Sequence, residues 1–218
     1  MAFPDTRHSA LAGLHHDDES IRRQSHEAIA TAYWQPVHNY LRLRWREKEE
    51  NAADLTQEFF SKAIEAGTLN TYDPARGTFR TYLRTCLDRF VINAHKRDSR
   101  RPTLRLDFDV EGPAESAEEV FQREWIRRLF SLAIEDLSGS LDDIRFQVFE
   151  SYDLAEAERR PTYAGLATQF NTTTDRITNY LAAARRDFRK AVLHRLRELT
   201  ANEREFRAEA RAILGVEL

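Results

Sequence analysis

Basic side chains dominate the stretch 73–101, and they are the residues with the most recognisable chemistry in the sequence. From Arg84 to Arg105, seven lysines and arginines stand against only Asp88 and Asp98. Guanidinium and ammonium groups gathered on one helix face bind phosphate oxygens, so such a surface is typical of nucleic-acid-binding proteins. The polar side chains that would form it are Arg80, Arg84, Asn93, Lys96 and Arg97.

A helix has to position these side chains, because apolar residues recur at every third or fourth position of the same stretch. At 3.6 residues per turn, this spacing gathers the apolar residues into one stripe that must be buried. We therefore expect one long helix with a packed side and a solvated basic side. The stripe consists of Phe79, Tyr82, Leu83, Cys86, Leu87, Phe90, Val91 and Ala94.

A second basic stretch lies near the C-terminus, where residues 176–197 hold seven lysines and arginines against Asp187. The pattern before and within it predicts a short helix over 162–169, a turn over 170–173, and a second helix that begins at Thr174. Two short helices with this spacing indicate a helix-turn-helix, whose second helix enters the major groove of DNA. The turn has Asn171 in place of the usual glycine, and asparagine tolerates the left-handed backbone conformation.

The composition favours an all-α fold. The chain has 218 residues, 41% of them hydrophobic, with only 7 glycines and 6 prolines, and alternating strand patterns are hard to find. A chain of this length accommodates two small domains. We predict two small helical domains joined by a linker over 102–117, which opens with a proline and then becomes acidic.

The sequence lacks the features of several protein classes. Its single cysteine, Cys86, can form neither an intramolecular disulfide nor a thiolate metal cluster, and we expect it to pack as a small apolar residue. No apolar run approaches the ~20 residues that span a bilayer, and the N-terminus has no signal-peptide core, so we expect a cytoplasmic protein without membrane contact. Without a phosphate-cradling glycine loop, a zinc motif or a nucleophile elbow, we expect no enzyme activity, metal or cofactor.

Two parts of the sequence resemble conserved regions of extracytoplasmic-function (ECF) sigma factors, the promoter-recognition subunits of bacterial RNA polymerase. NAADLTQEFFSKAIEAG followed by DPARGTFRTYLRTCLDRFVINAHKRDSRRP is similar to their second conserved region. PTYAGLATQFNTTTDRITNYLAAARRDFRKAV is similar to their fourth region. The resemblance implies a region 2-like helical bundle over 1–101, the linker over 102–117 and a region 4-like helix-turn-helix domain over 118–199. Beyond it, apolar residues at helical spacing predict a C-terminal helical extension over 200–218. Packing on either domain, holding the two domains together and binding a partner are its open alternatives.

The resemblance also implies DNA contacts from both domains. The first domain would bind the −10 promoter element, with the loop before the long helix holding an extruded base, through Tyr72, Arg76, Arg80, Asn93, Lys96, Arg97 and Arg100. The second would bind the −35 element through Asp175, Arg176, Thr178, Asn179, Arg185 and Arg186. We assign Phe79 to the core and leave Tyr82 between core and DNA. A basic helix end stabilised by the helix dipole is the alternative for the end of the long helix.

In the family, the helix that begins near Asn51 docks on core RNA polymerase through an acidic motif. Here Asn51 and Ala53 stand where many members have acids. The polymerase-binding candidates that remain are Asp54, Gln57 and Glu58. We therefore expect weak docking, since each lost surface pair contributes about 0.2–1 kcal/mol.

Some branches of the family with this deficit are activated by a Ser/Thr kinase. Thr56 is the only threonine in the helix, and a phosphate there would add about −1.5 to −2 charges. Thr56 is accordingly our candidate phosphorylation site, with a packing role as the alternative.

Together these patterns predict an alternative sigma factor that binds core RNA polymerase and promoter DNA, and that directs promoter recognition, melting and transcription initiation. A Ser/Thr kinase or an anti-sigma factor is the further expected partner. The main alternative is a helix-turn-helix repressor or activator that never binds core polymerase. A structural helical adaptor is a third possibility, and it predicts no salt-dependent DNA affinity.

Overall fold

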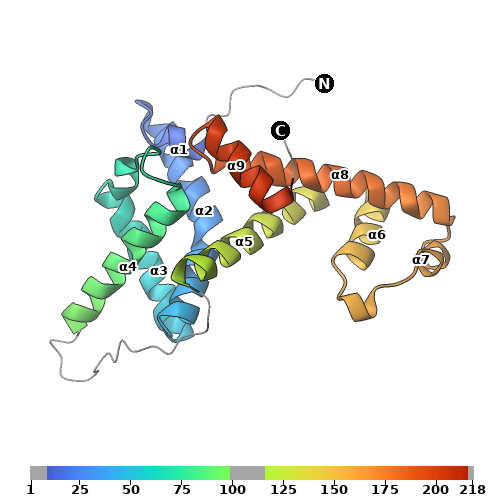
Figure 1. Ribbon diagram of the computed structural model, residues 1–218, viewed down its shortest axis with the longest axis horizontal. Helices are drawn as coiled ribbons and strands as arrows, with labels where there is room; N and C mark the ends of the chain where they lie inside the picture. The colour runs from blue at the N-terminus through green and yellow to red at the C-terminus, as the bar shows by residue number, and fades with distance from the viewer. Residues whose placement is uncertain (1–8, 99–115, 216–218) are drawn as a thin grey trace. The chain divides into compact units, whose positions relative to one another are not determined.

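The computed structural model describes residues 9–98 and 116–215, and these ranges contain helices and no strand. The predicted all-α class is confirmed. None of the described helices combines the length and apolar character that a membrane crossing requires. The elements shown in Figure 1 are α1 (Ala10–Gly13), α2 (Glu19–Arg44), α3 (Glu49–Glu65), η1 (Thr68–Thr71), α4 (Phe79–Asp98), α5 (Ala117–Ser140), α6 (Asp143–Asp153), η2 (Ala157–Arg159), α7 (Tyr163–Gln169), α8 (Thr174–Glu198) and α9 (Glu203–Leu214).

The chain forms two compact units whose boundaries differ from the predicted domains. Unit 1 comprises residues 1–128 with 197–218, and unit 2 comprises 129–196. The start of α5 belongs to unit 1 because its aromatic side chains pack there. The ring centroid of Phe121 lies 5.3 Å from that of Tyr40 on α2, and the Trp125 ring stacks at 6.4 Å on that of Tyr33. The predicted linker over 102–117 lies outside the described residues, apart from its last two positions.

The core of unit 1 is built on the apolar stripe of α4, as the periodicity predicts. Phe79, Leu83, Leu87 and Val91 are each at most 1% exposed. Ala94 is buried as well, whereas Tyr82, Cys86 and Phe90 are only partly buried. Cys86 was expected in the core, and it lies at the edge of the core with its side chain partly exposed. Burial raises the pKa of its thiol.

The opposing surface of unit 1 comes from α2 and α3. Asp18 caps α2 by accepting a hydrogen bond from the backbone N–H of Ser20 at 2.8 Å, which satisfies one of the free donors at the helix start. The helix then continues to Arg44 with Pro36 inside it. Buried side chains of these two helices include Ile29, Tyr33, Val37, Leu41, Leu55 and Phe59.

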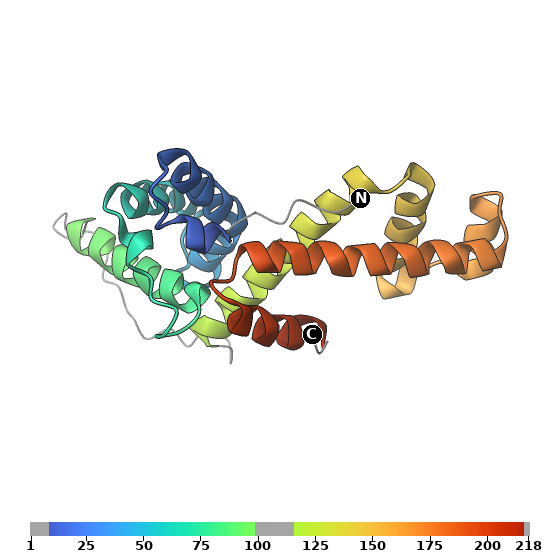
Figure 2. The same cartoon turned by 90° about the horizontal axis from the view of Figure 1, so that it is seen from above.

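Unit 2 contains the predicted helix-turn-helix. Thr162 caps α7 by accepting a hydrogen bond from the N–H of Gly165, and Asn171 in the turn has φ of 48°, the left-handed conformation expected of it. Figures 1 and 2 both show α7 beside the first turns of α8. The two helices and α6 are held together by a cluster of buried apolar side chains: Val148, Leu166, Ala167, Ile177 and Leu181.

Phe121→Ala tests whether the start of α5 belongs to unit 1. Removing this fully buried ring leaves a cavity against Tyr40, so we expect a loss of about 3–5 kcal/mol in the free energy of unfolding. Hydrogen exchange should accelerate in α2 and α4. Phe149→Ala, which removes a buried ring of unit 2, is the matched control and should accelerate exchange within residues 129–196. Unchanged exchange in α2 and α4 of the Phe121 variant would contradict this assignment.

Candidate nucleic-acid interface

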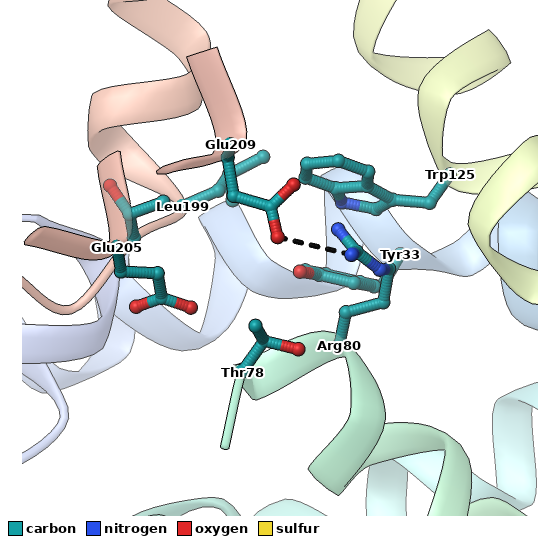
Figure 3. Close-up of a pocket in the computed structure, with 8 residues that line it drawn as sticks. Tyr33, Thr78, Arg80, Trp125, Leu199, Glu205 and Glu209 are labelled. Carbon is teal, nitrogen blue, oxygen red and sulfur yellow. Dashed lines mark hydrogen bonds and ion pairs between the residues drawn. The ribbon is translucent and has the colours of Figure 1, made fainter. Parts of the chain in front are cut away.

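The first turn of α4 carries a predicted DNA contact that is buried instead. Arg80 is 8% exposed, and its Nη2 donates a hydrogen bond to Oε1 of Glu209 on α9 at 3.0 Å. Its guanidinium carbon lies 4.5 Å from the ring centroid of Trp125 on α5 (Figure 3). The expectation that Arg80 lies on a solvated face is wrong, because α5 and α9 cover that part of α4.

The next basic residue of α4, Arg84, is also held by carboxylates. Its Nε donates to Oε2 of Glu118 at 2.7 Å, and its Nη1 donates to Oδ2 of Asp88 at 2.8 Å. Glu118 accepts a further hydrogen bond from the hydroxyl of Thr81 at 3.0 Å. The N-terminal half of the predicted basic face is therefore neutralised within unit 1.

The loop before α4 buries a second predicted DNA contact, Tyr72. This side chain is 7% exposed, its hydroxyl donates to the carbonyl of Gly77 at 2.9 Å, and its ring meets that of Phe79 edge-on at 5.2 Å. Phe79 lies in the core as expected. Gly77 has φ of 145°, which side chains rarely adopt, so glycine is needed for this loop. Tyr72 therefore shapes the loop from inside and is not exposed to DNA.

Two other residues of this region differ in exposure. Tyr82, which the sequence leaves between core and DNA, is half-buried, and its hydroxyl donates to the carbonyl of Thr68 at 2.6 Å. Arg76 is the most open of the predicted loop contacts, with 88% of its side chain exposed and an ion pair to Asp73 at 3.4 Å. Of the loop candidates, Arg76 can reach a phosphate without rearrangement.

The C-terminal half of α4 keeps its polar side in solvent. Asn93, Lys96 and Arg97 are all exposed, and Nη2 of Arg97 lies 3.2 Å from Oε1 of Glu58 on α3. The cations also lie at the end of the helix that carries partial negative charge, which stabilises them. Arg100, the remaining candidate of this group, lies outside the described residues. Here the basic face has the exposure that a nucleic-acid contact requires.

The exposed face of α3 is more acidic than the sequence indicates, because the helix begins at Glu49 and not near Asn51. Glu50 is exposed in the first turn, and it lies four positions before Asp54 on the same side of the helix. Sequence analysis missed it by starting the helix two residues late, although acids are favoured in a first turn. The face therefore gains a carboxylate beyond those predicted.

The predicted polymerase contacts lie on this same face. Asp54 and Gln57 are exposed, whereas Glu58 is partly buried and accepts hydrogen bonds from Lys62 and Arg97. The hydrogen bond from Lys62 lowers the pKa of the Glu58 carboxyl, which keeps it ionised. Glu58 thus joins the acidic face of α3 to the basic end of α4.

Thr56 is the clearest correction among the predicted sites. It is 0% exposed, and its hydroxyl donates to the carbonyl of Ala52, one turn earlier, at 2.7 Å. A kinase needs the hydroxyl in solvent, and a phosphate has no room among buried side chains. The packing role, which was the alternative, is the one that the structure shows.

The helix-turn-helix of unit 2 exposes every predicted DNA contact: Asp175, Arg176, Thr178, Asn179, Arg185 and Arg186. Buried Ile177 and Leu181 fix this orientation, since they hold the opposite side of α8 against α7. Arg185 is already paired, because its Nε and Nη2 donate to the two carboxylate oxygens of Asp153 at 2.9 and 2.8 Å. That hydrogen bonding raises the pKa of Arg185.

Metal binding finds no support in the described residues, which contain no group of three or more histidine, cysteine or acidic side chains placed to hold an ion. The candidate sites are the acidic face of α3 and the basic end of α4 in unit 1, which meet at Glu58 and Arg97, and the helix-turn-helix of unit 2.

Comparison with protein families gives one match. Residues 29–101 match the model of sigma-70 region 2, which here covers most of α2 together with all of α3 and the described part of α4. No curated protein and no solved structure matches the chain. The match coincides with the part of unit 1 that carries the acidic face of α3 and the basic end of α4, and over these residues the chain is similar to sigma-70 region 2.

Thr56→Glu tests the buried state of the predicted phosphorylation site. A carboxylate without a partner at this position should lower the free energy of unfolding by at least about 3 kcal/mol, measured by urea denaturation. The control is Gln57→Glu, the same acid at the exposed neighbouring position, which should change stability by less than about 0.5 kcal/mol. Equal stability of the two variants would mean that residue 56 can carry a charge, and would restore the phosphorylation hypothesis.

Proposed function

We propose, from the sigma-70 region 2 match of residues 29–101, that this chain is an alternative sigma factor of the ECF type. It binds core RNA polymerase, recognises and melts promoter DNA, and thereby starts transcription. The role is one of binding and carries no enzyme activity of its own. It would be exercised in the cytoplasm, where core polymerase works. The single observation that supports the proposal is that the matched segment presents an exposed acidic face on α3 and an exposed basic end on α4 in one folded unit.

Docking on core polymerase is assigned to the acidic face of α3. Glu50, Asp54 and Glu58 recur every four residues, and Gln57 lies three residues after Asp54, so a basic groove on the partner can meet them together. Such charge complementarity speeds association and fixes orientation more than it adds affinity. Glu50 adds one negative charge to the docking face and partly replaces the acids that are absent at Asn51 and Ala53.

Contact with the −10 element is assigned to the exposed end of α4. Lys96 and Arg97 are placed to neutralise phosphates, which positions the DNA, whereas the amide of Asn93 can pair with the edge of an adenine. Arg76 in the preceding loop adds a further exposed cation. Arg80 takes no part in this surface as long as α5 and α9 cover it, and Tyr72 is buried inside the loop against Gly77 and Phe79.

Contact with the −35 element is assigned to the start of α8 in unit 2. Arg176 and Asn179 lie one turn apart on the exposed side, where a guanidinium can pair with guanine and an amide with adenine in the major groove. Arg186 lies further along α8 and can reach the phosphate backbone. Arg185 would first have to leave Asp153, so its contribution to affinity is smaller.

For regulation, an anti-sigma factor that covers the acidic face of α3 is the partner class that fits the exposed surfaces of unit 1. We do not propose a kinase that acts at Thr56, because its hydroxyl is buried and donates a hydrogen bond to the carbonyl of Ala52. The competing function is a repressor or activator that uses the helix-turn-helix alone. It is favoured by the exposed start of α8, and it differs from a sigma factor in needing no core polymerase.

Asp54→Arg tests the polymerase contact. Reversing this exposed charge should lower transcription from a cognate promoter by core polymerase of the same organism about 5–10-fold, since it replaces attraction with repulsion at the docking face. The control is Glu27→Arg, the same kind of charge reversal at an exposed position of α2. Tight binding of a specific operator by the protein alone, with no transcription on adding core polymerase, would support the repressor instead.

Arg176→Ala tests the helix-turn-helix contact. We expect the complex with core polymerase to lose about 1–3 kcal/mol of affinity for its own −35 sequence and almost none for a scrambled one, measured by fluorescence anisotropy. Arg186→Ala is the comparison, because the loss of a phosphate contact should weaken binding to both sequences alike. Equal losses on both sequences for the Arg176 variant would remove it from base recognition.

A further inference from the structure

The first turns of α4 lie beneath α9 and the start of α5, and charged groups meet at this contact. Figure 3 shows the Arg80 guanidinium between the Trp125 ring and the carboxylate of Glu209. Both members of the ion pair are about nine-tenths buried. Glu205, one turn before Glu209 on α9, lines the same small pocket, and burial raises the pKa of its carboxyl. An arginine that the sequence assigns to DNA is thus held by an acidic helix of the same chain.

The bonding of Arg80 is incomplete. Among the described residues, its Nε has no hydrogen-bond partner although it is buried, and the same holds for Nε1 of Trp125 beside it. A buried ion pair adds stability only when its remaining donors and acceptors are also satisfied, and apolar side chains of similar size often serve a permanent core better. The Arg80–Glu209 ion pair is therefore a poor device for holding α9 permanently in place. It fits an arginine that exchanges Glu209 for another anionic partner.

The apolar contact of α9 is small as well. Phe206 is the one large apolar side chain of the helix that is buried, with Ala210 also buried, while Ile213 and Leu214 are only half-buried. Arg197 covers the Phe206 ring, its guanidinium carbon 4.0 Å from the ring centroid. A helix of 12 residues is not stable on its own, so α9 holds its form mainly by this contact. Losing the contact would free the whole helix.

We propose that α9 is a displaceable internal competitor of DNA, in which the Glu209 carboxylate occupies the place on Arg80 that a DNA phosphate takes when α9 leaves. The planar guanidinium binds carboxylate and phosphate oxygens with the same geometry, so one can replace the other. The protein then has a closed state, in which the end of α4 is the only part of that helix that faces DNA, and an open state, in which Arg80 extends that surface. The proposal rests on the proposed function, since it takes α4 to be a DNA-binding helix.

The test compares two full-length variants of α9 that carry the same added charge. Phe206→Asp removes the apolar contact, whereas Ala208→Asp places the acid at an exposed position of the same helix. The probe is a fluorescein-labelled single-stranded DNA of mixed sequence, about 20 nucleotides long, which spans more than one single-strand binding site. We expect the Phe206 variant to bind it about 5–10-fold more tightly, with a salt dependence steeper by about 0.7 for each phosphate gained.

Arg80→Met in the Phe206→Asp background shows whether Arg80 is responsible. This change should return the affinity to that of the Ala208 variant, because the uncovered cation is gone. Hydrogen exchange over 203–214 verifies that α9 has been released. If α9 is released and the affinity stays at the control value, α9 is a permanent brace and the proposal is wrong.

A second pair keeps the test decisive if Phe206→Asp does not fold. Glu209→Gln removes the charge that holds Arg80 and should raise affinity for the same probe, whereas Glu203→Gln, an equal change at an exposed position, should not. Equal affinities in this pair would overturn the proposal. The two failures are distinguishable: a parent chain that supports transcription while no variant gains affinity refutes the competitor alone, whereas a parent that neither binds DNA nor supports transcription refutes the proposed function.

Discussion

Burial of the apolar stripe of α4 determines where every charged side chain of that helix lies. Phe79, Leu83, Leu87 and Val91 leave almost no surface in solvent, so the helix cannot rotate without exposing them. The polar positions are then divided by what packs alongside. Those near the start of α4 face α5 and α9 and become ion pairs within the protein, whereas those near its end face solvent. One helix therefore has a covered and an open half.

Local periodicity made the helices and the helix-turn-helix predictable, since the 3.6-residue repeat and the turn residues are properties of short segments. The burial of Arg80 could not be predicted in this way, because its partner Glu209 is 129 positions away in the sequence and no local pattern indicates the contact. The prediction that Thr56 is a phosphorylation site is wrong for a different reason. On the helical wheel of α3, Thr56 lies between the buried residues Ala52 and Phe59, so the helical period alone does not decide whether its side chain is exposed. The start of α3 was placed too late, and Glu50 was missed with it.

Acidic residues set how much of the positive charge is available to DNA. Carboxylates hold Arg80 and Arg84 in unit 1, and Asp153 holds Arg185 in unit 2. A cation already paired within the protein contributes less to the sequence-independent attraction of DNA. This is consistent with a chain of net charge −3 that nevertheless presents basic helix surfaces. If the chain binds DNA as proposed, this pairing should lower its affinity for random DNA and give the base sequence more influence on binding.

The pairing of Arg80 with Glu209 also has an evolutionary consequence. Losing either side chain alone would strand the other charge in the interior, which is far more harmful than losing both together. Positions 80 and 209 should therefore change jointly among descendants of this protein. Lineages that lack the C-terminal helix should carry an uncharged side chain, or an open arginine, at the start of α4. One buried contact thus couples the substitutions that are tolerated at two positions far apart in the sequence.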